Sequence, residues 1–151
     1  MNLEEEASRI DGYLLAIAAL KEDGTSFRCV YLGEGEPSGK VAEVSARLGF
    51  ERGAITLVPR HDALTPENIP KGLEDWLLDR SFATEEGPPI DRRLVSALVA
   101  ELEDIFRTMP SWFSVERTAE YTNFGQHGAV WSMYVLGLAV GSCAIHCSWD
   151  R

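Results

Sequence analysis

The C-terminal part of the chain contains a long segment, Tyr121 to Trp149, that has no Asp, Glu, Lys or Arg. His127 and His146 are the only basic residues in it. Such a segment has to be buried, either in a bilayer or inside a folded domain. Its apolar part, Ala129 to Trp149, is about as long as the ~20 residues that a transmembrane helix needs.

Glycine and polar residues within this segment favour a folded core over a bilayer. Gly137, Gly141 and Ser142 lie in its middle, no basic cluster flanks it, and Asp150 follows directly. A tail anchor normally has basic residues on its cytoplasmic side. We therefore predict two buried strands that turn between Gly137 and Ser142, with the tail anchor as the alternative.

The charge of the chain restricts its partners. The 151 residues, the usual length of one domain, carry a net charge of -10 and have a pI near 4.7. An acidic surface repels nucleic acid and anionic lipid and attracts basic proteins. We therefore expect one domain, residues 1–151, that binds neither nucleic acid nor membrane and has a basic protein as its partner.

The cysteines indicate the compartment. Cys29, Cys143 and Cys147 are odd in number and widely spaced, which is not a disulfide framework. The chain starts Met-Asn-Leu-Glu-Glu-Glu, without the basic and apolar parts of a secretory signal. Both features predict a cytoplasmic protein in a reducing environment.

Helical periodicity is clearest over Asp91–Arg107, where Asp91 is a suitable cap. A second helix is expected from Ser38, as its cap, to Leu48, and a third over Lys71–Arg80. In the helix Asp91–Arg107 the apolar residues form one face: Leu94, Val95, Leu98, Val99, Leu102, Ile105 and Phe106.

Two further segments have the pattern of strands. Ala54–Val58 ends at Pro59, and Trp112–Val115 begins another strand. The first segment is ambiguous, because apolar residues from Leu3 to Ile17 have helical spacing while Tyr13–Leu20 is apolar on all sides. We predict a short helix followed by a hairpin of Tyr13–Leu20 with Phe27–Leu32.

These elements together predict an α+β fold, with a mainly antiparallel sheet and two to four helices packed on it. Residues 83–91, Ala-Thr-Glu-Glu-Gly-Pro-Pro-Ile-Asp, are the only linker-like stretch. Neither flank is large enough to fold comfortably alone, so the stretch joins two layers of a single domain.

The glycine-rich stretch Gly33-Glu-Gly-Glu-Pro-Ser-Gly-Lys40 resembles a phosphate-binding loop in its position between a strand and a helix. Its spacing fails, because the residue that should be the first glycine is Glu34. Val41 replaces the hydroxyl that would reach magnesium, and the glutamates oppose phosphate binding. We interpret the stretch as a turn and predict no nucleotide or other cofactor.

Cysteine and histidine residues are the other candidates for chemistry. Cys143-Ala-Ile-His146-Cys147 offers zinc ligands, but on a strand His146 points away from both cysteines. We therefore predict no metal site. Cys29 with His61 or His127 provides a nucleophile and base only if the fold brings them together, so no complete catalytic motif is present.

An acidic chain without catalytic machinery favours protein binding. Our leading hypothesis is an immunity or inhibitor protein that neutralises a bacterial toxin, a basic nuclease-type one, by direct binding. The candidate contact residues come from the linker, the second half of the chain and one polar loop: Glu85, Glu86, Glu101, Asp104, Trp112, His61 and Asp62.

Two alternatives remain open at the level of sequence. One is a small cytosolic enzyme or ligand-binding protein whose pocket contains Cys29, His61, His127 or His146. The other is a subunit of a larger assembly, such as a homodimer that uses the uncharged C-terminal segment as its interface.

Overall fold

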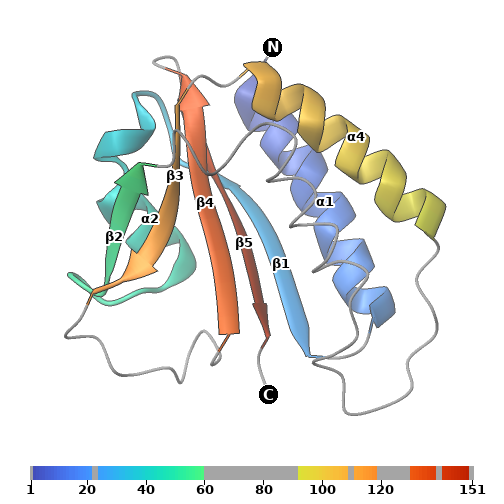
Figure 1. Ribbon diagram of the computed structural model, residues 1–151, viewed down its shortest axis with the longest axis horizontal. Helices are drawn as coiled ribbons and strands as arrows, with labels where there is room; N and C mark the ends of the chain where they lie inside the picture. Colours follow the sequence, from blue (N-terminus) through green and yellow to red (C-terminus); the bar gives the residue numbers. More distant parts are fainter. Residues whose placement is uncertain are drawn as a thin grey trace.

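The computed structural model describes residues 2–21, 24–59, 92–108, 111–118, 130–138 and 141–149. Within these ranges the chain forms one five-stranded sheet with strand order β1-β5-β4-β3-β2. Every neighbouring pair of strands is antiparallel. Helices lie on both faces of the sheet (Figure 1), so the α+β class with an antiparallel sheet is confirmed.

The uncharged segment forms two adjacent strands near the middle of the sheet, as predicted. β4 pairs with β5 so that Gly137 lies opposite Ser142. No helix in the described part of the chain is long and apolar enough to cross a bilayer. The strand bounds are Thr25–Tyr31 for β1, Ile55–Pro59 for β2, Ser111–Arg117 for β3, Val130–Leu138 for β4 and Gly141–Trp149 for β5.

The first helix, α1, runs from Leu3 to Lys21, so the predicted strand Tyr13–Leu20 is wrong. The helical spacing does not stop at Gly12 but continues into the apolar stretch. Ile10, Leu14 and Ile17 are all buried against the sheet. Each such burial is worth roughly 1.5–3 kcal/mol, which outweighs the local cost of one helical glycine, about 1 kcal/mol.

The helix α4, Arg92–Thr108, confirms the predicted amphipathic helix and lies beside α1 on the same face of the sheet (Figure 1). Its buried side chains join those of α1, β1 and β5 in one apolar core. From α4 this core receives Val95, Leu98, Val99 and Leu102. The side chains of Ile105 and Phe106 lie outside the described residues.

The opposite face of the sheet is covered by a 3-10 turn, η1 (Pro37–Gly39), and by α2 (Val41–Leu48). Ser38 lies inside η1 and does not cap α2, because η1 inserts a turn before the helix and Lys40 becomes the N-cap residue. The predicted cap is therefore wrong. The predicted end of the helix at Leu48 is confirmed, since Gly49 follows with φ 76°.

Successive side chains of β5 point alternately to the two faces of the sheet and so to two separate apolar cores. Cys143 and Cys147 point to the core beneath α1 and α4. Ala144 belongs to the second core, and the His146 ring packs edge-on against Phe50 at a centroid distance of 6.0 Å. The prediction that the cysteines share one face and the histidine lies on the other is confirmed.

Charged side chains cover the outer edge of β1, the first strand of the sheet. The Asp11 carboxylate of α1 accepts a hydrogen bond from the Cys29 backbone N–H at 2.7 Å and pairs with Arg28 at 2.9 Å. Arg47 of α2 donates to the Tyr31 carbonyl at 2.9 Å. An exposed edge with free backbone groups invites strand pairing, so these contacts protect it.

The predicted helix Lys71–Arg80 and the linker 83–91 lie outside the described residues.

Candidate functional site

The outward surface of α1 is apolar over its C-terminal half. Tyr13, Leu15 and Leu20 are 38%, 48% and 49% exposed and are the exposed large apolar side chains of the described residues. Gly12, Ala16 and Ala19 are the other exposed positions between residues 12 and 20. We call this surface, the exposed residues between 12 and 20 of α1, the apolar half of α1. Helix surfaces that meet only water normally carry charged or polar residues.

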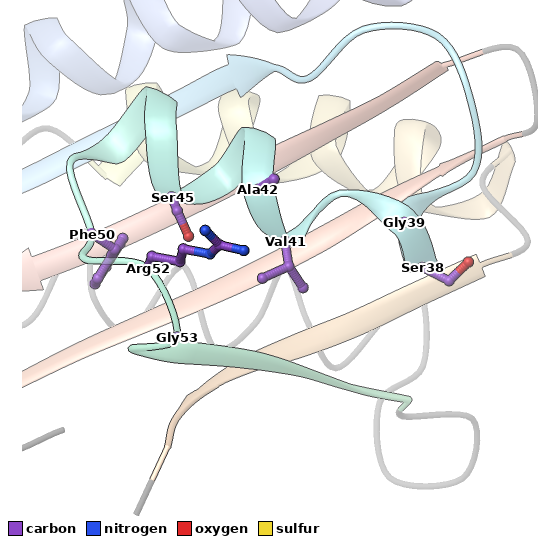
Figure 2. Close-up of a pocket in the computed structure, with 8 residues that line it drawn as sticks. All are labelled: Ser38, Gly39, Val41, Ala42, Ser45, Phe50, Arg52 and Gly53. Carbon is purple, nitrogen blue, oxygen red and sulfur yellow. The ribbon is translucent and has the colours of Figure 1, made fainter. Parts of the chain in front are cut away.

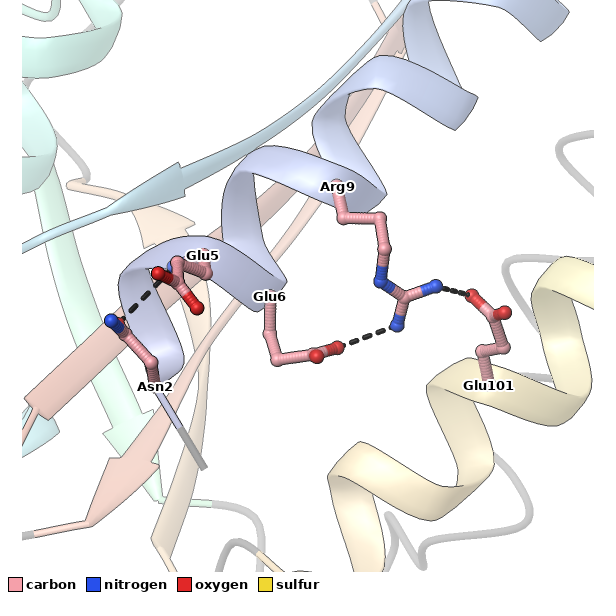
Figure 3. Close-up of polar contacts among 5 residues, drawn as sticks. All are labelled: Asn2, Glu5, Glu6, Arg9 and Glu101. Atoms are coloured by element: carbon pink, nitrogen blue, oxygen red, sulfur yellow. Dashed lines mark hydrogen bonds and ion pairs between the residues drawn. The ribbon is translucent and has the colours of Figure 1, made fainter.

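The N-terminal half of the same helix is acidic. Glu4 and Glu5 are exposed in its first turn, where negative charge also interacts favourably with the helix dipole. Asn2 caps the helix, since its side-chain oxygen accepts hydrogen bonds from the N–H groups of Glu4 at 3.1 Å and Glu5 at 3.3 Å. Figure 3 shows the bond from Glu5. One helix thus presents a negative end and an apolar end.

An arginine joins α1 to α4. The Arg9 guanidinium group donates hydrogen bonds to the carboxylates of Glu6 on its own helix and Glu101 on α4 (Figure 3). These bonds, first that of Glu6 and then that of Glu101, raise the pKa of Arg9 above its ordinary value. The bridge places Glu101, one of the residues predicted to bind a partner, at the seam between the helices.

The other predicted contact residues do not all gather at this surface. Asp104 is exposed on α4, while Trp112 lies in β3 and its side chain is outside the described part. Four further candidates also fall outside the described residues: Glu85, Glu86, His61 and Asp62.

Sequence reasoning missed α1 as part of this surface. The available signal was the stretch Tyr13–Leu20, which is apolar on all sides. When one face of a helix is buried, its other face normally carries polar and charged residues. Apolar residues on that other face therefore indicate a contact surface. Assigning the stretch to a strand concealed that signal.

The thiols lie in the core and not at a reactive surface. Cys29, Cys143 and Cys147 are free and buried. A hydrogen bond with Cys143, followed by burial, raises the pKa of Cys29, and burial alone raises the pKa of Cys147. Reactive thiols need a lowered pKa. Among the described residues no group of His, Cys, Asp and Glu side chains is arranged to hold a metal ion.

A pocket of about 720 Å³ opens on the α2 side of the sheet (Figure 2). Val41, Ala42 and Phe50 supply its apolar wall. Polar groups come from two serines and one arginine. The described lining residues are Ser38, Gly39, Val41, Ala42, Ser45, Phe50, Arg52 and Gly53, and none of them is a cysteine or histidine.

The glycine-rich turn next to this pocket is occupied by its own lysine. Lys40 Nζ donates a hydrogen bond to the Glu34 carbonyl, and the turn closes around the ammonium group at Gly33 and Gly35. Ser142 of β5 also holds the turn, through a 2.7 Å bond from its hydroxyl to the Gly35 carbonyl. A phosphate-binding lysine would extend toward the ligand instead.

The described fold defines the chain as an α+β protein with an antiparallel sheet between helices. Comparison with family models, with curated proteins and with solved structures found no match to this chain.

Proposed function

We propose that this chain is an acidic protein-binding module that binds a basic protein through the outer surface of α1 and α4. The observation that carries the proposal is the exposure of Tyr13, Leu15 and Leu20 on the outward surface of α1. Tyr13 and Leu20 lie along one side of this surface and Leu15 along the other, with the exposed Ala16 and Ala19 between them. Large apolar side chains of this kind, grouped on one surface, mark contact sites, and a tyrosine is a frequent anchor residue.

Charge at the same surface supports a basic partner. Glu4 and Glu5 lie on the helix that carries the apolar half of α1, and Asp104 is exposed on the neighbouring helix. Carboxylates at the margin of an apolar contact speed the encounter with a positive surface and reject negative ones. A second copy of this chain would bring like charges together, which disfavours self-association through this surface.

An immunity or inhibitor role is the specific form of this proposal. A basic toxin, such as a nuclease that binds nucleic acid through positive charge, offers the complementary surface. Both helices pack into one apolar core, and Arg9 pairs with Glu101 across them, so a partner can bind with little reorganisation of this surface. Free buried cysteines support a reducing, cytoplasmic location.

Capture of a partner from the native cells tests the proposal when it is combined with matched variants. The double variant Leu15→Gln/Leu20→Gln removes apolar contact from the proposed surface, while Ala46→Gln changes an exposed helical position on the other side of the sheet. We expect one basic protein at a fixed ratio, bound at least about tenfold more weakly by the double variant and equally well by Ala46→Gln.

Two further measurements test whether charge speeds the association and whether the partner is an inhibited nuclease. The association rate should fall as salt is raised and fall again in Glu4→Gln/Glu5→Gln. Titration of the purified partner should abolish its nuclease activity at a one-to-one ratio. Self-association alone, seen by light scattering, would contradict the proposal. So would a partner that binds Leu15→Gln/Leu20→Gln as tightly as the unchanged protein.

A further inference from the structure

The pocket on the α2 side of the sheet combines features that the proposed protein interface does not use. Its volume of about 720 Å³ lies within the range of roughly 300–1,000 Å³ that is typical of small-molecule sites. Its lining comes from α2 and the residues on either side of that helix. Figure 1 shows α2 on the face of the sheet opposite to α1. A ligand bound here would therefore leave the α1 and α4 surface free.

Its wall is apolar at one side and positively charged at the other. Phe50 is buried, and its ring has an edge-on contact with the His146 ring. Figure 2 shows the guanidinium group of Arg52 pointing across the pocket toward Ser45 and Val41. Within the described part of the chain, Arg52 has no carboxylate partner at ion-pair distance.

We propose that this pocket binds a small organic carboxylate. The apolar body of the ligand lies against Phe50, Val41 and Ala42, and its carboxylate pairs with Arg52. A guanidinium group matches the two oxygens of a carboxylate, and the serine hydroxyls supply additional donors.

Charge limits the ligand to a single negative group. The pocket offers one guanidinium group among its described lining residues, while Lys40 is held by the Glu34 carbonyl. A net charge of -10 disfavours ligands with several phosphates. An apolar monocarboxylate therefore fits better than a nucleotide or a sugar phosphate.

Octanoate is a suitable probe, and octan-1-ol is its uncharged counterpart. Binding is followed by two-dimensional amide NMR of the whole chain, with each probe titrated separately. We expect saturable shifts at the lining residues with octanoate, and binding of octan-1-ol at least about tenfold weaker.

Variants link the binding to the pocket. Arg52→Gln should weaken octanoate at least about tenfold. Ala42→Leu should block it by filling the pocket from an exposed position on α2. Arg93→Gln, which removes the same charge from α4, should leave the affinity unchanged.

Absence of saturable shifts at the lining residues would overturn the proposal. Equal binding of octanoate and octan-1-ol, or an Arg52→Gln variant that binds normally, would overturn the carboxylate class. Neither result bears on the protein interface at α1.

Discussion

Gly12 lies in a helix and Gly137 in a strand, and the space around the two glycines differs. A Cβ atom at Gly137 would lie 2.4 Å from the Gly141 carbonyl oxygen and 2.8 Å from the Ser142 Cα atom. At Gly12 a Cβ atom would have no neighbour within 4 Å. The close approach of β4 to β5 therefore requires a glycine at position 137, whereas α1 merely tolerates one at position 12.

Alanine substitutions at these positions should shift stability in opposite directions. Gly137→Ala pushes against backbone atoms that cannot rotate away, so we expect a loss of about 2–3 kcal/mol. Gly12→Ala removes a flexible residue from the exposed side of α1 and should add about 0.5–1 kcal/mol. Urea unfolding of both variants measures the free energies. A stable Gly137→Ala protein would contradict the close strand contact.

At the scale of elements, the outer edge of β1 is protected by side chains of two helices that cover opposite faces of the sheet. Asp11 comes from α1 and Arg47 from α2. Together they occupy one N–H group and one carbonyl group that point away from β5. This arrangement prevents another strand from adding to the sheet at these positions.

Removal of the Asp11 carboxylate should destabilise this edge. Asp11→Ala leaves the Cys29 N–H without its acceptor, and we expect a loss of roughly 1–3 kcal/mol. Asp11→Asn keeps an oxygen acceptor and loses only the pairing with the half-exposed Arg28, so its loss should be smaller. Urea unfolding compares the two variants. Equal losses would show that the ion pair matters and the backbone hydrogen bond does not.

At the scale of the whole molecule, the sheet separates two surfaces of different character. The α1 and α4 side presents apolar and acidic side chains, and the α2 side presents a pocket with an arginine. The buried cysteines lie between them, so only unfolding of the core exposes their thiols to water.

The thiols should make the protein less stable in alkaline solution. The pKa values of Cys29 and Cys147 are raised in the folded state, so well below pH 8.5, the ordinary pKa of a thiol, both states keep these protons. Above that pH the unfolded chain releases them and the folded chain does not. The free energy of unfolding therefore falls, by at most about 1.4 kcal/mol per pH unit for each thiol.

Urea unfolding between pH 7.5 and 9.5 measures this slope. Cys147→Ala removes one of the thiols, so its free energy should fall less steeply with pH than that of the unchanged protein. The difference between the two slopes isolates the thiol from other groups that titrate in this range. Identical slopes would contradict the raised pKa of Cys147.

The sequence by itself determined those elements whose buried residues recur at the spacing of a helix or a strand. The uncharged stretch predicted β4 and β5, the apolar stripe of Asp91–Arg107 predicted α4, and alternation along β5 predicted that His146 and the cysteines occupy opposite faces. Each inference needs only the repeat of a helix or strand, which is a property of neighbouring residues.

Only the tertiary structure decided the conformation of Tyr13–Leu20 and the location of the surfaces that remain exposed. A stretch that is apolar on all sides fits a buried strand as well as a helix, and packing of Ile10, Leu14 and Ile17 on the sheet resolves the ambiguity. The Arg9–Glu101 bridge joins residues that are far apart in the sequence, and the pocket around Arg52 depends on how residues 38–53 fold against the sheet. Their positions depend on what packs against each element, because burial is a property of the whole fold.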